Sequence, residues 1–377
     1  MFSLQATCPD TKARAGTMNL PHAAVETPVF MPVGTQGSVK TLHPRELNDE
    51  LGARIILGNT YHLWLRPGTD IIGKMGGLHD FSAWPNALLT DSGGFQVWSL
   101  AKLRKISEKG VTFQSHLDGS RLELTPEKSM EIQSILGSDI AMLFDECPPY
   151  PCERAYAEES TALTSRWAKR CKEWIETAGQ NAPKPQHHFG IVQGSIYEDL
   201  RERSAKDLVD LDFDGYAIGG VSVGEPEVEM MRAIDNAEPY LPQEKPRYAM
   251  GLGTPPQILA MIARGVDMFD CVHPTRSARH GLAYTPDGPI HIKNARFADD
   301  PRPLTEDCHP HLRQFSRAYL RHLFKAGEIL ALRLLSFHNL DFYLRLTRAA
   351  RKAILEGNFP AFHADFLARY ESQTSKS

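Results

Sequence analysis

The sequence lacks several features that would place it in common protein classes. It has 377 residues and no apolar run of about 18 or more, so no membrane span is predicted. Its first residues lack the basic and apolar segments of a signal peptide. The six cysteines show no framework spacing, which favours reduced thiols in a cytoplasmic protein. No G-x-G-x-x-G follows the first expected strand, which argues against a dinucleotide-binding fold.

Bulk charge gives no indication of a nucleic-acid partner. The net charge is −4 at pH 7 and the isoelectric point is about 6.4. Local charge differs, because Arg313, Arg317, Arg321 and Lys325 recur at a spacing that puts them on one helix face. We favour a solvated helix face as the interpretation. A phosphate-binding stripe is the more specific alternative.

Short apolar segments recur along the chain, and most of them end in glycine or a polar residue. There are eight: Pro28–Gly34, Arg54–Asn59, Ala87–Asp91, Asp139–Asp145, His187–Gln193, Gly215–Gly220, Arg247–Gly251 and Val266–Cys271. Continuous apolar runs of this length are typical of buried parallel strands.

Helical patterns separate most of these segments. Examples are Thr125–Leu136, Glu158–Glu176, Tyr197–Leu208 and Pro255–Ala263. Eight strands that alternate with helices predict an α/β fold, a (β/α)₈ TIM barrel. An open, doubly wound sheet is the structural alternative.

The pattern changes after the eighth expected strand. Two short strand-like pieces, Gly281–Tyr284 and Pro289–Ile292, are followed by a long helical stretch and then a helix over Leu340–Gly357. We therefore expect a single catalytic barrel domain over residues 1–377. A small subdomain, at about 282–340, would be inserted before the last barrel helix.

The expected strand ends carry three carboxylates, one amide and several glycines. In a barrel of this kind, catalytic residues lie at the C-terminal ends of the strands. A helix cap explains one aspartate there, but not Asp91, Asp145 and Asp270 from three different strands. Two carboxylates that face one pocket suit chemistry at a sugar carbon, one as nucleophile and the other as proton donor and acceptor. These residues by themselves indicate a glycosyl-transfer reaction, but they do not indicate its substrate.

Motifs at these same positions resemble one family. Over nearly the whole chain they are L-G-N-T-Y-H-L-x-L-R-P-G (Leu57 to Gly68), T-D-S-G-G-F-Q (Thr90 to Gln96), F-D-E-C (Phe144 to Cys147), G-I-V-Q-G (Gly190 to Gly194), Y-A-I-G-G (Tyr216 to Gly220), M-G-L-G-T-P (Met250 to Pro255), F-D-C-V-x-P-T-R (Phe269 to Arg276) and N-A-R-F (Asn294 to Phe297). In this order they resemble the bacterial tRNA-guanine transglycosylases, also called queuine tRNA-ribosyltransferases.

The resemblance implies a pentosyltransferase of queuosine biosynthesis. It would exchange guanine at the wobble position of G-U-N tRNAs for 7-aminomethyl-7-deazaguanine. Asp270 matches the nucleophile, which forms a covalent intermediate with the ribose, and Asp91 matches the general acid/base. The implied partners are tRNA, the deazaguanine base and a second copy of the chain in a homodimer. No organic cofactor is expected.

The resemblance also assigns binding residues. The base would be held by Ser92, Gly93, Gly94, Phe95, Asp145, Gln193, Gly219, Gly220 and Met250. Phe95 and Met250 would sandwich it, and the other side chains and backbone N–H groups would bind its edge. The tRNA would contact Gly251, Leu252, Gly253, Thr254, Thr275, Arg276 and Arg279.

The choice of base rests on few positions. Cys147 and Val223 match the bacterial form, whose bulk near the aminomethyl group leaves no room for queuine, and Val221 stands where leucine is common. A related transglycosylase that uses queuine or another deazaguanine is the alternative. A non-catalytic tRNA-binding paralogue should lack the nucleophile, so the presence of Asp91 and Asp270 argues against it. A barrel glycosidase is the interpretation that ignores the resemblance.

The family's structural zinc pattern, Cys-x-Cys-x-x-Cys with a later histidine, is not intact. The three cysteine positions fall on Asp307, His309 and Leu312, and only His338 stays in register. Cys308, His309, His311 and His338 could make a Cys-His₃ zinc set. The alternative is a metal-free subdomain, held by the packing of Phe315, Leu320, Leu323, Leu332 and Leu335.

Overall fold

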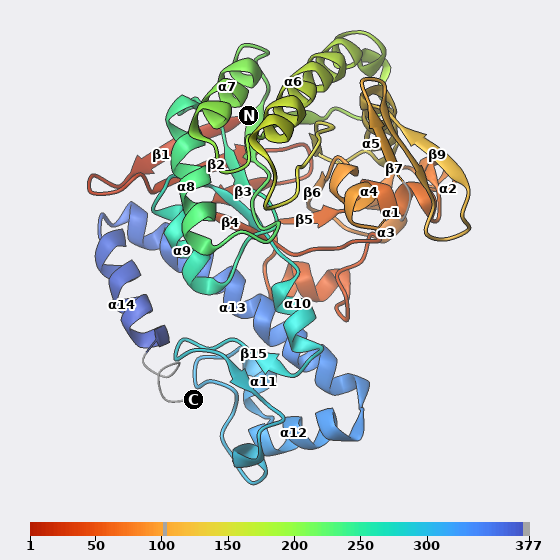
Figure 1. The fold of residues 1–377 in the computed structure, drawn as a ribbon. Coiled ribbons are helices and arrows are strands. Elements are labelled where there is room, and N and C mark those ends of the chain that lie inside the picture. The colour runs from red at the N-terminus through yellow and green to blue at the C-terminus, as the bar shows by residue number, and fades with distance from the viewer. Residues whose placement is uncertain (101–103, 372–377) are drawn as a thin grey trace.

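An eight-stranded parallel sheet lies at the centre of the computed structural model, which describes residues 1–100 and 104–371 (Figure 1). The strands are β4 (Val29–Met31), β5 (Ile55–Gly58), β6 (Ala87–Thr90), β10 (Ile140–Met142), β11 (His187–Val192), β12 (Gly215–Ile218), β13 (Arg247–Ala249) and β14 (Met268–Asp270). Each lies within one of the eight segments predicted from the sequence. In the described part of the chain, no helix is both long and apolar enough to cross a membrane.

The sheet closes on itself. Its strand order is β4-β14-β13-β12-β11-β10-β6-β5, and every neighbouring pair is parallel. A parallel bridge between Val33 and Leu57 joins the β4 and β5 ends. The predicted (β/α)₈ barrel is therefore confirmed.

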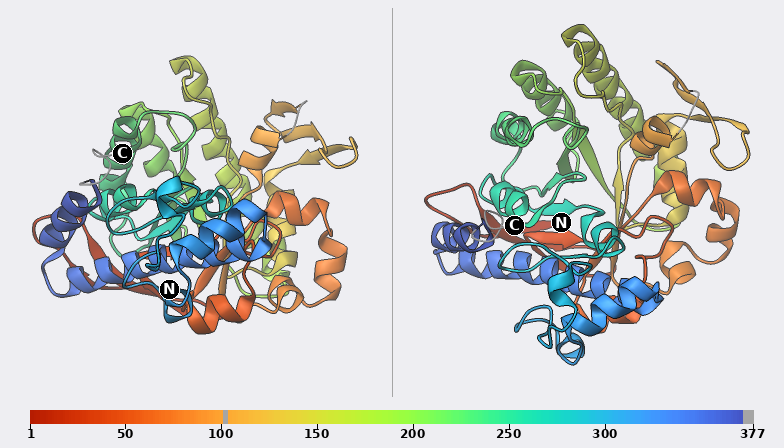
Figure 2. Two further views of the ribbon diagram at one scale, coloured as in Figure 1. Left: turned by 90° about the horizontal axis from the view of Figure 1, so that it is seen from below. Right: turned by 60° about the horizontal axis from the view of Figure 1, so that its bottom comes forward.

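Helices surround the sheet, as Figures 1 and 2 show from different sides. The segment after β5 carries α1 (Thr60–Leu65), α2 (Thr69–Lys74) and α3 (Leu78–Ser82). The other outer helices are α5 (Pro126–Leu136), α6 (Arg154–Glu176), α7 (Glu198–Val209), α8 (Glu227–Ala237), α9 (Pro255–Ile262) and α13 (Ile329–Leu355). Short single turns are η1 (Glu46–Glu50), η2 (Ala178–Asn181), η3 (Glu238–Tyr240) and η4 (Ala295–Phe297).

An N-terminal antiparallel sheet packs against the barrel interior and was not predicted. It consists of β1 (Phe2–Thr7), β2 (Arg14–Asn19) and β3 (Ala24–Thr27). Met18, Leu20 and Val25 from this sheet join the buried cluster formed by the inward-facing strand residues. The strand β2 begins with a charged residue, Arg14, so its sequence did not indicate a buried strand. Arg14 is nevertheless buried, because Asp267 pairs with its guanidinium group.

A second antiparallel sheet interrupts the barrel between β6 and α5. After α4 (Gly94–Leu100) it comprises β7 (Arg104–Ser107), β8 (Gly110–Gln114) and β9 (Arg121–Leu124). The outer strands β7 and β9 are short and largely exposed, and β8 buries only Gly110, Val111 and Phe113, so the sequence offered no continuous buried run to predict them.

The segment after β14 forms a small cluster of its own, which Figure 1 shows at one end of α13. Its elements are α10 (His273–Ala278), β15 (Leu282–Ala283), β16 (Ile290–His291), α11 (Pro310–Arg313) and α12 (Arg317–Ala326). Leu320 and Leu335, two of the residues named for a metal-free subdomain, lie in this buried cluster.

The last barrel helix begins earlier than predicted. We expected a start at Leu340, but α13 begins at Ile329, because its 27 residues contain no glycine or proline to break it. The helix packs against β4 and α10 and ends before Gly357. A further helix, α14 (Phe359–Glu371), packs on α13 and was not predicted.

Candidate active site

Asp91 follows directly after β6 and is buried. The backbone N–H of Thr60 donates to its Oδ1 at 2.8 Å, and the amide of Asn59 donates to its Oδ2. Burial raises the pKa of Asp91 to about 6; the hydrogen bonds lower it, and the charge of Asp270 raises it. A carboxyl with this pKa is populated in both protonation states near neutral pH, as an acid/base group requires.

Asp270 is the last residue of β14 and is also buried. The Tyr248 hydroxyl donates to its Oδ1 at 2.5 Å, and the backbone N–H of Gly251 donates to the same atom at 2.8 Å. Burial raises the pKa of Asp270, and these two donors oppose the shift. Both of these hydrogen bonds fall on Oδ1, and neither involves Oδ2.

Asp145 lies between two donors at the end of β10. Ser92 Oγ donates to its Oδ1 at 2.9 Å, and Gln193 Nε2 donates to its Oδ2 at 2.7 Å. Burial raises the pKa of Asp145, and both donors lower it. The Oε1 atom of Gln193 is buried and has no hydrogen-bond partner in the described part of the chain. Such an orphaned acceptor is unfavourable unless a ligand satisfies it.

Glycines let the backbone approach these polar groups. A Cβ at Gly94 would lie 2.7 Å from the carbonyl oxygen of Asp145. At Gly220, which has φ +60°, a Cβ would lie 2.4 Å from Gln193 Oε1, and at Gly219 it would lie 2.8 Å from Gln193 Nε2. Any side chain at these three positions would displace the acid or the amide beside it.

A fully buried arginine anchors the loops that carry Gln193 and the two glycines. Arg201 of α7 donates to four backbone carbonyls, those of Val192, Ser195, Gly219 and Gly220, at 2.6–3.2 Å. Burial lowers the pKa of Arg201 to about 10, so it stays charged at neutral pH. We did not predict this residue, because an arginine within a helical pattern gives no signal of burial.

Phe95 and Met250, the two residues expected to stack on the base, follow two different strands, β6 and β13. Phe95, in the first turn of α4, is 42% exposed. Met250 follows β13 and packs against the barrel interior. Gly93, before Phe95, adopts φ +81°, a backbone conformation that favours glycine.

The loop after β13 leads into α9 and contacts Asp270 through Gly251. Gly251 is exposed and binds Asp270, whereas Leu252 and Gly253 are buried. Thr254 caps α9 in a reciprocal pair with Gln257. Of the four loop residues expected to bind tRNA, Gly251 is the one with a hydrogen bond to Asp270 among the described residues.

Helix α10 begins three residues after Asp270 and carries the expected anticodon-reading side chains. Thr275 is buried, Arg276 is exposed, and Arg279 is half-buried with its Nη1 lacking a partner among the described residues. The exposed His280 holds the Arg276 carbonyl through Nδ1 at 2.8 Å. Arg276 is thus free to reach solvent at the barrel mouth.

Val221 and Val223, two of the three residues expected to select the base, lie in a loop that a buried glutamate holds. Glu225 accepts hydrogen bonds from the backbone N–H groups of Ser222 and Val223, the latter at 2.9 Å. Val221 is buried and Val223 half-buried, while burial raises the pKa of the Cys147 thiol. Cys147 is therefore a protonated, apolar wall rather than a nucleophile.

Sequence reasoning named the acids and three of their hydrogen-bond partners, Ser92, Gln193 and Gly251, but missed Asn59, Thr60 and Tyr248. Asn59 and Thr60, which bind Asp91, lie in the quoted motif Leu57 to Gly68 directly after β5, so their position at a strand end was an available signal. Tyr248 lies inside β13, where an aromatic residue reads as core. Only the three-dimensional contact with Asp270 reveals its role.

The four residues expected to bind zinc do not come together. Among the described residues, His309 and His311 form a group of potential metal ligands with Glu50, and no such group includes Cys308 or His338. Cys308 is buried, and burial raises the pKa of its thiol.

His338 is engaged elsewhere. Its Nε2 lies 2.8 Å from the Tyr284 carbonyl, its buried Nδ1 has no hydrogen-bond partner among the described residues, and burial lowers its pKa to about 4. Asp307, at one of the family's cysteine positions, pairs instead with Arg345 at 3.0 Å. The residues at the family's metal positions therefore do not fit a zinc site in this structure.

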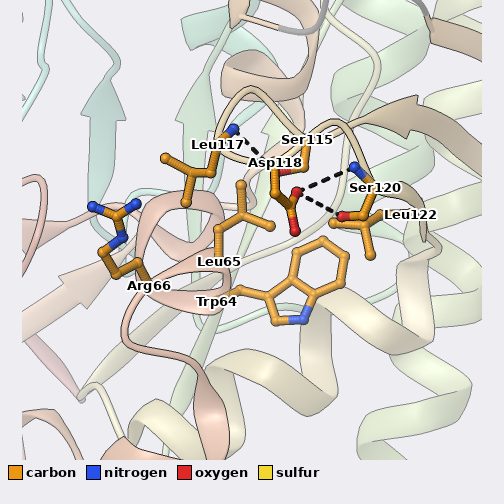
Figure 3. A pocket seen from close by; sticks show the side chains of 8 residues that line it. All are labelled: Trp64, Leu65, Arg66, Ser115, Leu117, Asp118, Ser120 and Leu122. Carbon is orange, nitrogen blue, oxygen red and sulfur yellow. Dashed lines mark hydrogen bonds between the residues drawn. The ribbon is translucent and has the colours of Figure 1, made fainter.

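A surface hollow near the barrel mouth holds none of the expected site residues. It has a volume of about 410 Å³ and lies between the end of α1 and the turn joining β8 to β9 (Figure 3). Trp64 forms one wall, and Asp118 on the other binds Ser120 within its own turn. We assign it no catalytic role.

Comparison with known proteins decides the family. A family model described as queuine tRNA-ribosyltransferase matches residues 8–372. The queuine tRNA-ribosyltransferase of Natranaerobius thermophilus is 54% identical over 372 residues, which cover 98% of this chain and 99% of that protein. The protein of the same name from Staphylococcus aureus strain JH9 is 54% identical over 365 residues, covering 97% and 95%.

The chain belongs to the queuine tRNA-ribosyltransferase family. The resemblance noted from the motifs is thereby confirmed, and so is the expectation of an enzyme, because members of this family are tRNA-guanine transglycosylases. A transglycosylase must bind a base and act at a ribose carbon. The cluster of Asp91, Asp145, Gln193 and Asp270 at one barrel mouth supplies groups for both tasks.

Proposed function

We propose that this protein exchanges guanine at the wobble position of G-U-N tRNAs for 7-aminomethyl-7-deazaguanine, as a step of queuosine biosynthesis. The observation that carries the proposal is the pairing of two buried carboxylates with unlike environments. Asp270 has both hydrogen bonds on one oxygen, whereas Asp91 has a donor on each. Unlike environments suit unlike roles.

In the first displacement, Oδ2 of Asp270 attacks C1′ of the ribose and the bond from C1′ to the base nitrogen breaks. The bonding electron pair stays on guanine, and a proton from Asp91 neutralises it. The pKa of about 6 at Asp91 makes a protonated fraction available near neutral pH. The products are free guanine and an ester between Asp270 and the ribose.

In the second displacement, the incoming base loses its proton to Asp91 and attacks C1′. The carboxylate of Asp270 leaves with its electron pair, so the enzyme returns to its starting state. Asp145 would accept from the base's N–H groups, and Gln193 with the Gly220 backbone N–H would serve the base carbonyl oxygen. Phe95 and Met250 would stack on its two faces.

Preference for the aminomethyl base is supported by the walls around Glu225. Val223 and Cys147 would put apolar bulk where queuine carries its cyclopentenediol ring, and the Val221 carbonyl would accept from a primary amine. Binding of tRNA would use the Gly251–Thr254 loop and α10. We further propose that the enzyme acts as a homodimer in the cytoplasm.

The deciding experiment measures incorporation of radiolabelled guanine into unmodified tRNA with a G-U-N anticodon. We expect exchange by the wild type and a loss of about 10³-fold or more in Asp270→Ala. Wild type should also give an enzyme–tRNA adduct that survives denaturation, and Asp270→Ala should not. Equal incorporation by the variant, or none by the wild type, would refute the proposal. Competition by 7-aminomethyl-7-deazaguanine but not by queuine distinguishes the base.

A further inference from the structure

The residues that follow β10 make their contacts in two different directions. Phe144 and Glu146 contact α6, whereas Asp145 between them contacts groups at the ends of β6 and β11. The Phe144 ring stacks on Trp167 of α6, with the ring centroids 4.8 Å apart. Both neighbours of Asp145 are therefore attached to one helix, and its carboxylate makes its contacts elsewhere.

Three hydroxyl groups of α6 bind Glu146, which is 4% exposed. The Tyr156 hydroxyl donates to Oε1 at 2.8 Å, and the Ser160 hydroxyl donates to Oε2. The backbone N–H of Glu146 donates to Thr164 Oγ1 at 3.0 Å. Because these three residues are spaced by four along α6, they lie on one face of the helix. The side chain and the backbone of Glu146 are thus both fixed to α6.

We propose that Glu146 is a positioning residue for base recognition, which uses α6 to hold Asp145 where the base requires its carboxylate. The inference rests on the proposed role of Asp145 in binding the N–H groups of the base. Glu146 acts through Asp145, because its own hydrogen bonds go to α6 and not toward Ser92 and Gln193.

The chemistry of Glu146 argues for more than packing. A buried carboxyl costs free energy that an apolar side chain at this position would avoid. Burial raises the pKa of Glu146 to about 7 and the charge of Asp145 raises it as well, whereas the hydrogen bond from Tyr156 lowers it. Hydrogen bonds to hydroxyls on a helix are directional, so they fix the orientation of this segment more narrowly than apolar contact would.

The segment is also confined on the side of α4. A Cβ at Gly94 would lie 2.7 Å from the Asp145 carbonyl oxygen, so the two backbones are already in contact. A cavity bordered by Gly94, Asp145 and Glu146 has a volume of about 10 Å³, room for at most one water molecule. Contact with α4 on one side and hydrogen bonds to α6 on the other therefore fix Asp145. Loss of the Glu146 side chain removes one of these two constraints.

The test compares guanine with hypoxanthine, which lacks the exocyclic amine, as competing bases for exchange by the full-length protein. An acceptor aimed at the amine should make the wild type prefer guanine. Glu146→Ala should raise KM for guanine by about tenfold or more and lower kcat by less. Hypoxanthine has one N–H group fewer for Asp145, so its inhibition constant should change less and the preference for guanine should fall. Glu146→Gln keeps the shape and can bind both hydroxyls, so it should restore most of the preference.

Three further variants give the reference values. Asp145→Asn should lose the preference for guanine, and Glu158→Gln, on the exposed surface of α6, should keep it. Tyr156→Phe removes one donor to Glu146 and should lower the preference by about threefold, which carries the test if Glu146→Ala does not fold.

Wild-type preference in Tyr156→Phe and in folded Glu146→Ala, checked by circular dichroism, would overturn this inference. If Asp145→Asn loses the preference in the same experiments, the proposed function stands without it. Wild-type preference in Asp145→Asn would instead remove the base-binding role on which the inference rests.

Discussion

Tyr248 shows how a single hydroxyl can tune the nucleophile. It is buried in β13 and donates to Asp270 at 2.5 Å, which opposes the rise that burial causes in the pKa of Asp270. Tyr248→Phe removes the donor, so the pKa of Asp270 should rise further. The carboxylate is needed in its ionised form, and the acidic limb of the guanine-exchange profile should therefore move to higher pH. The free energy of a hydrogen bond to a charged group corresponds to a loss of exchange rate of about tenfold on the acidic limb. At alkaline pH the exchange rate should change little.

Tyr216→Phe is the matched control for this prediction. Tyr216 is equally buried in the neighbouring strand β12, but its hydroxyl accepts from the Phe213 backbone N–H, away from Asp270. Its pH profile should keep the wild-type midpoint. A Tyr248→Phe profile that superimposes on the wild type after scaling would show that the hydroxyl does not act on the ionisation of Asp270.

At the scale of elements, buried arginines position loops through backbone carbonyls. Arg201 on α7 binds four carbonyls at the ends of β11 and β12. Arg201→Met should leave these acceptors unsatisfied, lower the free energy of unfolding by about 3–5 kcal/mol and raise KM for guanine more than it lowers kcat. Urea unfolding and the KM-against-kcat split measure the two effects. Arg203→Met, on the exposed face of the same helix, should change neither the free energy of unfolding nor KM. An equally large effect of Arg203→Met would contradict the role assigned to the buried Arg201.

The stripe of basic residues near α12 is explained at this scale too. Arg313 donates to the Cys308 carbonyl, Arg317 to the carbonyls of Pro303 and Leu304, and Arg321 to that of Asn294. These guanidinium groups therefore tie the segment after β14 to itself. Arg313 and Lys325 are exposed, as a solvated helix face requires, whereas Arg317 and Arg321 are half-buried. The spacing of charges along the sequence does not reveal which carbonyls lie nearby.

At the scale of the whole molecule, Asp139 joins the N-terminal sheet to the barrel. It accepts from His22, in the turn before β3, and from His79 and Leu88 near β6. Burial alone would raise the pKa of Asp139, but the hydrogen bonds from His79 and His22 outweigh it and the pKa lies below its ordinary 3.8. Its contribution to stability is therefore present above pH 3.8 and is lost as the pH falls through the lowered pKa.

Asp139→Asn tests this linkage. The variant should lose about 2–4 kcal/mol of unfolding free energy at pH 7, and the difference from wild type should shrink below about pH 4. Urea titrations across this range measure it. Asp235→Asn, which removes an exposed ion pair with Arg264, should cost under about 1 kcal/mol. A deficit in Asp139→Asn that stays constant into the acid range would contradict the role of its ionisation.

The sequence by itself determined the barrel and the position of its acids. Parallel strands buried on both faces need continuous apolar runs, so eight such runs were visible, and Asp91, Asp145, Gln193 and Asp270 stand where those runs end. Only the tertiary structure decided what those acids touch. Tyr248 and Asn59 reach them from the neighbouring strands β13 and β5, and Glu50 meets His309 and His311 from a distant part of the chain. Periodicity reports burial along one segment, whereas these contacts depend on how separate segments pack.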